Sequence, residues 1–144
     1  MKVLFDTSVL IAAMVESHQK HQVALPWLQR SKRGDIETVV AAHTLAECFA
    51  VLTTLPVRPR IGTGIAQKMI SVNIEQTARI VSFSDKDYKI VIKQMSEKGL
   101  AGGIIYDALI TRVALKSGVD QLLTMNISHF EKLWTGEPAA LCEP

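Results

Sequence analysis

The 144-residue sequence has only two cysteines, no long apolar run and a net charge of only +2. Cys48 and Cys142 form no CxxC pair, and the cysteine and histidine spacings typical of zinc sites are absent. The longest apolar run covers residues 9–15, far short of the roughly 20 residues that a membrane-spanning helix needs. These absences argue against a membrane span and a zinc module, and they favour reduced, structural cysteines.

The start of the chain also lacks a signal peptide, because Asp6 interrupts its apolar character. We therefore expect a cytoplasmic protein. Hydrophobic residues make up 48% and charged residues 21% of the chain, which is close to the average for globular domains and argues against disorder. A chain of this length buries about two-thirds of its surface on folding. We expect a single domain over residues 1–144.

Short apolar runs rich in β-branched residues alternate with longer helical patterns, without an internal repeat. The strands are expected at residues 3–5, 38–41, 79–83 and 121–124, with an edge strand near 140–141. The helices are expected at residues 8–14, 20–32, 44–54, 62–70, 84–98, 104–116 and 128–133. This alternation predicts an α/β fold in which helices cover both faces of a parallel sheet.

Three carboxylates stand among apolar residues. Asp6 follows the first strand, Glu47 lies one turn into the helix after the second strand, and Asp107 opens the helix before the fourth. In a doubly wound sheet these places converge at the edge where the strands end. Asp120 precedes the fourth strand, so we expect it at the opposite edge in a structural role.

Each acid also has a purely structural explanation. Asp6 is a good N-cap for the first helix, and Glu47 completes a capping box with Thr44. Asp107 suits the positive end of its helix dipole. Taken together, however, three convergent carboxylates would repel one another, and a hard divalent cation removes that repulsion. Mg²⁺ or Mn²⁺ held this way suits phosphodiester hydrolysis.

The charges outside this trio favour a polyanionic substrate. Without the three acids, 11 Asp and Glu remain against 16 Lys and Arg, a surplus of five positive charges. Basic residues gather in three clusters, each of which also fits an ordinary solvated surface: Arg30, Lys32 and Arg33; Arg58 and Arg60; and Lys86, Lys89 and Lys93.

Four short segments follow one another along the chain. They are VLFDTSVLI at residues 3–11, AHTLAE at 42–47 with VLT at 51–53, YDALI at 106–110, and LLTMN at 122–126 through Phe130. In this order and at these spacings they resemble the motifs of the PIN-domain family, and within it those of the VapC-type toxin ribonucleases of toxin–antitoxin systems.

The resemblance implies a three-layer α/β/α fold with a central parallel sheet and an endoribonuclease that depends on Mg²⁺ or Mn²⁺. It also implies a cognate antitoxin, an RNA substrate and a homodimer. The metal-binding acids of the family correspond to Asp6, Glu47 and Asp107. Where a fourth acid is common, this chain has Asn126, which offers a carbonyl oxygen without charge. We expect Asn126 to be an auxiliary catalytic residue, and its neutrality argues against a second tightly held ion.

Weaker candidates surround these four residues. Ser8 and Thr124 are candidates to hydrogen-bond a site acid or water, with capping and packing as the alternatives. His43 either tunes Glu47, touches RNA or simply begins its helix. The remaining candidates for substrate contact, each with a structural alternative, are His129, Trp27 and Trp134.

Three other functions stay open. A PIN nuclease that processes RNA without being a toxin would have the same active site. A PIN-fold binding module would have lost catalysis through Asn126. A phosphatase of the haloacid dehalogenase type also begins with a strand and an aspartate, but it needs Asp-x-Asp, and here the second position is Ser8.

Overall fold

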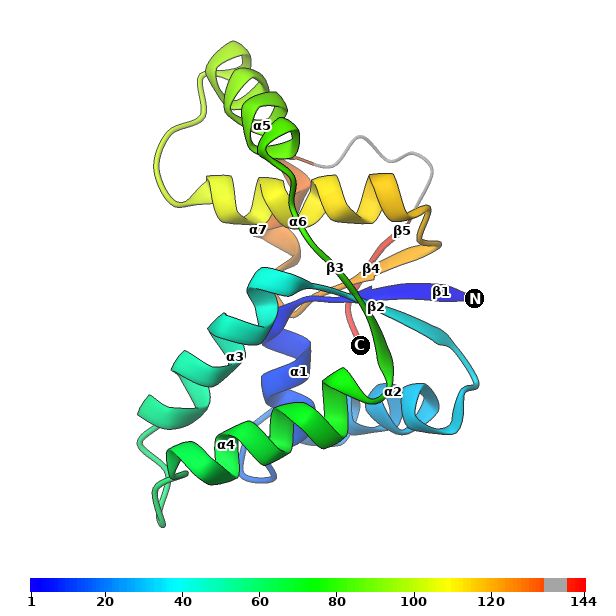
Figure 1. Cartoon of the computed structure of the whole chain (residues 1–144), viewed down its shortest axis with the longest axis vertical. Coiled ribbons are helices and arrows are strands. Elements are labelled where there is room, and N and C mark those ends of the chain that lie inside the picture. The colour runs from blue at the N-terminus through cyan, green and yellow to red at the C-terminus, as the bar shows by residue number, and fades with distance from the viewer. Residues whose placement is uncertain (134–139) are drawn as a thin grey trace.

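The computed structural model describes residues 1–133 and 140–144 and contains a five-stranded parallel sheet in the order β3-β2-β1-β4-β5 (Figure 1). In the central strand, Leu4 pairs with Val39 on one side and with Leu122 on the other. Residues 3–5 are fully buried, as expected for a parallel strand that is covered on both faces. The strands are β1 (Lys2–Phe5), β2 (Glu37–Ala41), β3 (Ala78–Val81), β4 (Gln121–Leu123) and β5 (Ala140–Cys142).

Helices cover both faces of the sheet, which confirms the predicted three-layer α/β/α architecture. One face carries α1 (Thr7–Met14), α2 (His21–Arg33), α3 (Ala42–Thr54) and α4 (Thr63–Ile70), and a π-helical turn, η1 (Ser71–Glu75), continues α4. The other face carries α5 (Asp85–Lys98), α6 (Ile104–Ser117) and α7 (Ile127–Glu131). Among the described residues, none of these helices has both the length and the apolar character that crossing a membrane requires.

The side chains of β1 alternate between two hydrophobic cores. Val3 and Phe5 pack with α1–α4, in a cluster that includes Leu10 and Leu52. Leu4 points to the other face and packs with residues of α6 and α7, including Phe130. The two cores fix the helices against the sheet. Functional residues are therefore expected in the loops at the sheet edges.

The helix ends follow the signals in the sequence. Ser84 and Asp87 form the expected capping box at the start of α5. Gly118 ends α6 with a φ of 62°, a left-handed conformation that glycine adopts without strain. At the sheet edge where the strands begin, the backbone N–H of Lys2 donates to Asp120 Oδ2 at 2.7 Å. This contact confirms the structural role expected of Asp120.

The strand order fixes where a site can form. From β1 the chain runs outward through β2 to β3, and it then crosses to β4 on the other side of β1. The strand order therefore reverses between β1 and β4. In open α/β sheets, ligands bind at such a switch point, beyond the carboxyl ends of the strands. Asp6 follows β1 directly and Thr124 follows β4 directly, so both lie at this point.

Candidate active site

Asp6 is buried at the switch point with 7% of its surface exposed. It occupies the N-cap position of α1, but its side chain makes no capping hydrogen bond, so the explanation of Asp6 as a helix cap is wrong. Its Oδ2 instead accepts hydrogen bonds from Ser8 Oγ at 3.0 Å and Thr124 Oγ1 at 2.9 Å. These two contacts confirm the predicted role of both hydroxyls.

The same two hydroxyls tie Asp6 to the loop that follows β4. Ser8 Oγ accepts a hydrogen bond from the backbone N–H of Met125, and Thr124 Oγ1 accepts one from that of Asn126, each at 3.0 Å. Each hydroxyl therefore donates to the carboxylate and accepts from the backbone. The arrangement holds the Asp6 carboxylate in a defined orientation and places Asn126 beside it.

Glu47 reaches the site from the second turn of α3. Thr7 Oγ1 donates to its Oε2 at 3.1 Å, and His43 Nε2 lies 3.1 Å from its Oε1. The predicted capping box with Thr44 is wrong: α3 begins after Ala41, and within the described residues the buried Thr44 hydroxyl has no hydrogen-bond partner. The side chain of Glu47 is thus held by Thr7 of α1 and by His43, one turn earlier in α3.

Asp107 lies in the first turn of α6, where its charge also suits the helix dipole. Its side chain is 29% exposed, and His129 Nδ1 lies 3.9 Å from its Oδ2. His129, a predicted candidate for substrate contact, therefore lies near the site: its ring faces Asp107, and its backbone N–H donates to the carbonyl of Asn126 at 3.0 Å.

One pocket of about 430 Å³ is lined by all four predicted site residues, Asp6, Glu47, Asp107 and Asn126. Its wall also includes His18 and Lys20, from the loop between α1 and α2. The sequence analysis missed these two residues, because nothing in the local sequence shows that this loop returns to the carboxyl edge of the sheet. They bring a titratable ring and a positive charge to an otherwise acidic pocket.

Burial disfavours the charged form of two carboxylates in this pocket, those of Asp6 and Asp107. Burial raises the pKa of Asp6, and the hydrogen bonds from Thr124 and Ser8 oppose that rise. Burial also raises the pKa of Asp107, and the nearby charge of Asp6 adds to this effect. The thiol of Cys48, buried behind the site, has its pKa raised to about 12, first by burial and then by the neighbouring carboxylates. Cys48 and Cys142 are both free thiols, as predicted.

The donor set fits a hard divalent cation. Carboxylate and amide oxygens are ligands that Mg²⁺ prefers, and a cation in the pocket would favour the charged form of Asp107, whose pKa is raised first by burial and then by the charge of Asp6. Within residues 1–133 and 140–144, no three Asp, Glu, His or Cys side chains are gathered closely enough to hold one ion jointly. Because Mg²⁺ usually retains several waters, acids that line a common pocket suffice without forming a closed cage.

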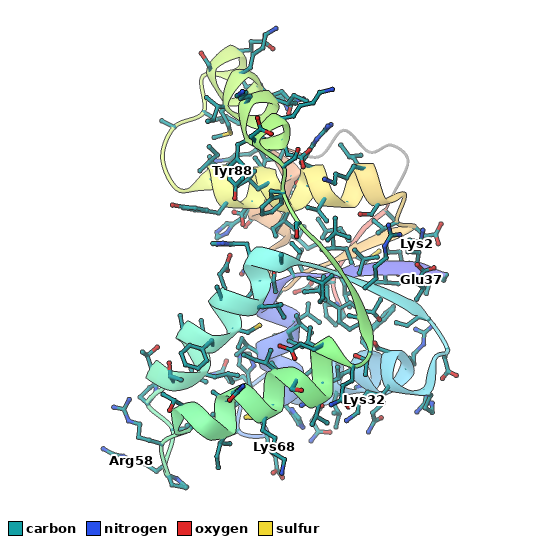
Figure 2. All side chains as sticks on the ribbon, in the orientation of Figure 1. Lys2, Lys32, Glu37, Arg58, Lys68 and Tyr88 are labelled. Carbon is teal, nitrogen blue, oxygen red and sulfur yellow. The ribbon has the colours of Figure 1, made fainter. Side chains whose placement is uncertain are left out.

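The predicted basic clusters lie away from this pocket. Figure 2 shows Lys32 beside α2 and Arg58 beyond the end of α3. Arg33 pairs with Asp35 near the edge where the strands begin, because α2 ends there before β2. On α5, Lys89 and Lys93 form ion pairs along their own helix. Of the basic residues, it is Lys20 that lines the acidic pocket.

Of the two tryptophans, Trp27 is described by the structure, and it does not line the pocket. Trp27 is partly buried against the core beneath α2, and the guanidinium of Arg30 lies 4.7 Å from the centre of its ring. This position agrees with a packing role for Trp27, the structural alternative to stacking on an RNA base. Trp134 lies outside the described residues.

Comparison with known proteins shows the family. The model of the PIN domain family matches residues 3–133. Ribonuclease VapC40 of Mycobacterium tuberculosis is 29% identical over 126 residues, which cover 88% of this chain and 87% of the relative.

Two solved structures share the fold. The VapBC2 structure from Rickettsia felis, bound to a promoter DNA fragment, has a TM-score of 0.68 at 19% identity and covers 100% of this chain and 99% of that one. Mycobacterium tuberculosis VapC20, described as a Sarcin-Ricin loop cleaving toxin, has a TM-score of 0.64 at 16% identity, with 83% and 86% covered. The chain therefore belongs to the PIN domain family.

Proposed function

We propose that this protein is a metal-dependent endoribonuclease that acts as the toxin of a toxin–antitoxin pair. The observation that carries the proposal is the buried carboxylate of Asp6, oriented by two hydroxyls at the switch point of the sheet and sharing one pocket with Glu47 and Asp107. Within the described residues, none of these three acids forms an ion pair with a lysine or arginine. Their uncompensated charge supports a cation as the missing partner.

Asp6, Glu47 and Asp107 would hold Mg²⁺ or Mn²⁺, with Asn126 as a neutral oxygen donor nearby. When bound, the ion supplies Lewis acidity, which activates a water nucleophile and offsets the charge of the phosphate oxygens. The hydroxyls of Ser8 and Thr124 keep the Asp6 carboxylate oriented during this chemistry. Thr7 and His43 contact different carboxylate oxygens of Glu47 and so restrain its side chain.

The pocket also supports a nucleic-acid substrate. Lys20 and His18 line the same pocket as the acids, so a phosphate approaching the metal site would meet a positive charge at its rim. Sequence-specific RNA recognition targets single-stranded loops, whose backbone can bend into a shallow pocket of this kind. These features favour a flexible RNA strand over a regular duplex.

The toxin role is supported by the relatives. Ribonuclease VapC40 aligns over most of the chain, and the structural relative VapC20 is described as a Sarcin-Ricin loop cleaving toxin. We propose a cognate antitoxin protein as the physiological inhibitor, and a homodimer as the active form. Growth inhibition would distinguish the toxin from an RNA-processing nuclease. RNA cleavage would distinguish it from a binding module.

The experiment is an RNA cleavage assay with purified protein, with Mg²⁺ or Mn²⁺ and with EDTA. We expect discrete fragments from the wild type in the presence of metal and none from Asp6→Asn. Asp120→Asn is the matched control, because Asp120 is an aspartate at the opposite edge of the sheet, and this variant should cut normally. Expression in bacteria should arrest growth for the wild type and not for Asp6→Asn. Folded wild-type protein that cuts no RNA with either metal would overturn the enzymatic proposal.

A further inference from the structure

Tyr106 joins the two helices that carry Glu47 and Asp107. It precedes Asp107 in the first turn of α6, and its ring lies parallel to that of His43 in α3, with 5.9 Å between the centroids and 7° between the planes. His43 in turn contacts Glu47 at 3.1 Å. The pair of rings is therefore linked to two acids that line the pocket, to Glu47 by the contact with His43 and to Asp107 by its neighbouring position in α6.

Tyr106 exposes more than half of its surface. It is 56% exposed, although a large ring loses stabilisation when it stays in water. Tyr88, on α5, is also exposed, at 43%, but packs its ring edge-on against Phe83, away from the pocket. Single exposed apolar residues are common on protein surfaces. Tyr106 differs because its ring stacks on that of His43, which contacts Glu47, and because it directly precedes Asp107 in α6.

We propose that Tyr106 is the platform on which a nucleobase of the RNA stacks, next to the phosphate that enters the acidic pocket. The proposal rests on the proposed function and adds the way in which the substrate is held. Unpaired bases present a flat π surface that stacks on tyrosine whatever the base is. Because His43 already holds the ring, little side-chain freedom remains to be lost on binding.

The platform explains how a shallow pocket holds a flexible strand. A phosphate held by Lys20, which lines the pocket, would position the RNA backbone but would read no base. A stacked base adds an anchor on the α6 side of Asp107, so that the strand is held at two points with the metal site between them. The proposal thus assigns Tyr106 to substrate binding and leaves catalysis to the acids.

The test measures binding without cleavage. A fluorescently labelled single-stranded RNA of random sequence is titrated with the full-length protein in EDTA. Alanine substitution of a stacking aromatic costs about 1–3 kcal/mol per base, so Tyr106→Ala should raise Kd by about 5- to 150-fold. Tyr106→Phe keeps the ring and should bind within about twofold of the wild type. Tyr88→Ala, which removes another exposed tyrosine that does not line the pocket, should bind like the wild type.

Each outcome decides the proposal. If Tyr106→Ala has the melting temperature and the RNA affinity of the wild type, the platform does not exist, whether or not the protein cuts RNA. If Tyr106→Ala changes only the monomer–dimer equilibrium, the ring belongs to an interface and the proposal falls. If wild-type protein cuts nothing with metal but its RNA binding requires the ring at position 106, the platform stands and the proposed nuclease activity falls.

Discussion

Asp87 should be the main electrostatic link between α5 and α6, and its removal should lower stability measurably. Its side chain is only 4% exposed and accepts hydrogen bonds from Lys116 Nζ and from Arg112 Nε, the latter at 3.0 Å. It also accepts a hydrogen bond of 2.8 Å from the backbone N–H of Ser84, which is one half of the capping box. In Asp87→Ala all of these contacts are lost together.

The magnitude follows from these contacts. Loss of the cap costs about 1 kcal/mol. Loss of the two charge-assisted hydrogen bonds costs about 1–3 kcal/mol, because Arg112 and Lys116 are roughly one-third exposed and regain water. We therefore expect the free energy of unfolding to fall by about 2–4 kcal/mol, which for a chain of this size lowers Tm by about 6–12 °C. Urea and thermal unfolding followed by circular dichroism measure both quantities.

The pH dependence provides a second check. The ion pairs with Lys116 and Arg112 hold the pKa of Asp87 well below its usual value of 3.8. A lowered pKa in the folded state stabilises the protein above the unfolded pKa, and this contribution is lost as the pH falls toward the folded value. The stability difference between wild type and Asp87→Ala should stay constant above about pH 5 and narrow below about pH 4.

A matched control lies on the same helix. Asp85 pairs with Lys89, but both side chains are more than three-quarters exposed, so Asp85→Ala should cost no more than about 0.5 kcal/mol. The reasoning would be refuted if Asp87→Ala cost as little as Asp85→Ala, or if its stability difference did not change in acid.

Three further predictions concern the site and the core. Thr124→Val removes a buried donor to Asp6; it should cost about 1–3 kcal/mol in urea unfolding and reduce metal-dependent RNA cleavage, and full activity would contradict the orienting role of the hydroxyl. Phe130→Ala empties a fully buried position against the sheet and should cost about 3–5 kcal/mol in the same measurement, whereas a loss below about 1 kcal/mol would contradict this packing. Asn126→Asp adds a charge to the pocket and should tighten Mn²⁺ binding in calorimetry, and unchanged affinity would place the side chain away from the ion.

The strands and helices were predictable because their signals are local. Parallel strands that are buried on both faces read as short apolar runs, and the predicted strands at 38–41 and 121–124 match β2 and β4 to within one residue at each end. Gly118 and the Ser84 capping box marked helix ends for the same reason. The π-helical turn at Ser71–Glu75 was not predicted, because its wider hydrogen-bonding pattern is rare and has no simple sequence signal.

The convergence of the acids was predictable, but their contacts were not. Strand order and chain direction alone bring Asp6 and Glu47 to the same sheet edge. The hydrogen bond from Thr7 to Glu47 and the stacking of His43 on Tyr106 depend on how α1, α3 and α6 cross in space. No periodicity or motif encodes those crossings, so the structural alternatives for Asp6 and Glu47 stayed open until the contacts were seen.

We propose that the pocket lined by Asp6, Glu47 and Asp107 binds the divalent cation on which RNA cleavage depends, with waters completing the coordination. Calorimetric titration of the purified protein with Mn²⁺ tests it most directly, with Asp6→Asn as the variant and Asp120→Asn as the control. The account predicts one tightly bound ion per chain in the wild type and the control, and at least about tenfold weaker binding in Asp6→Asn. Equal Mn²⁺ affinity in Asp6→Asn and the wild type would contradict it.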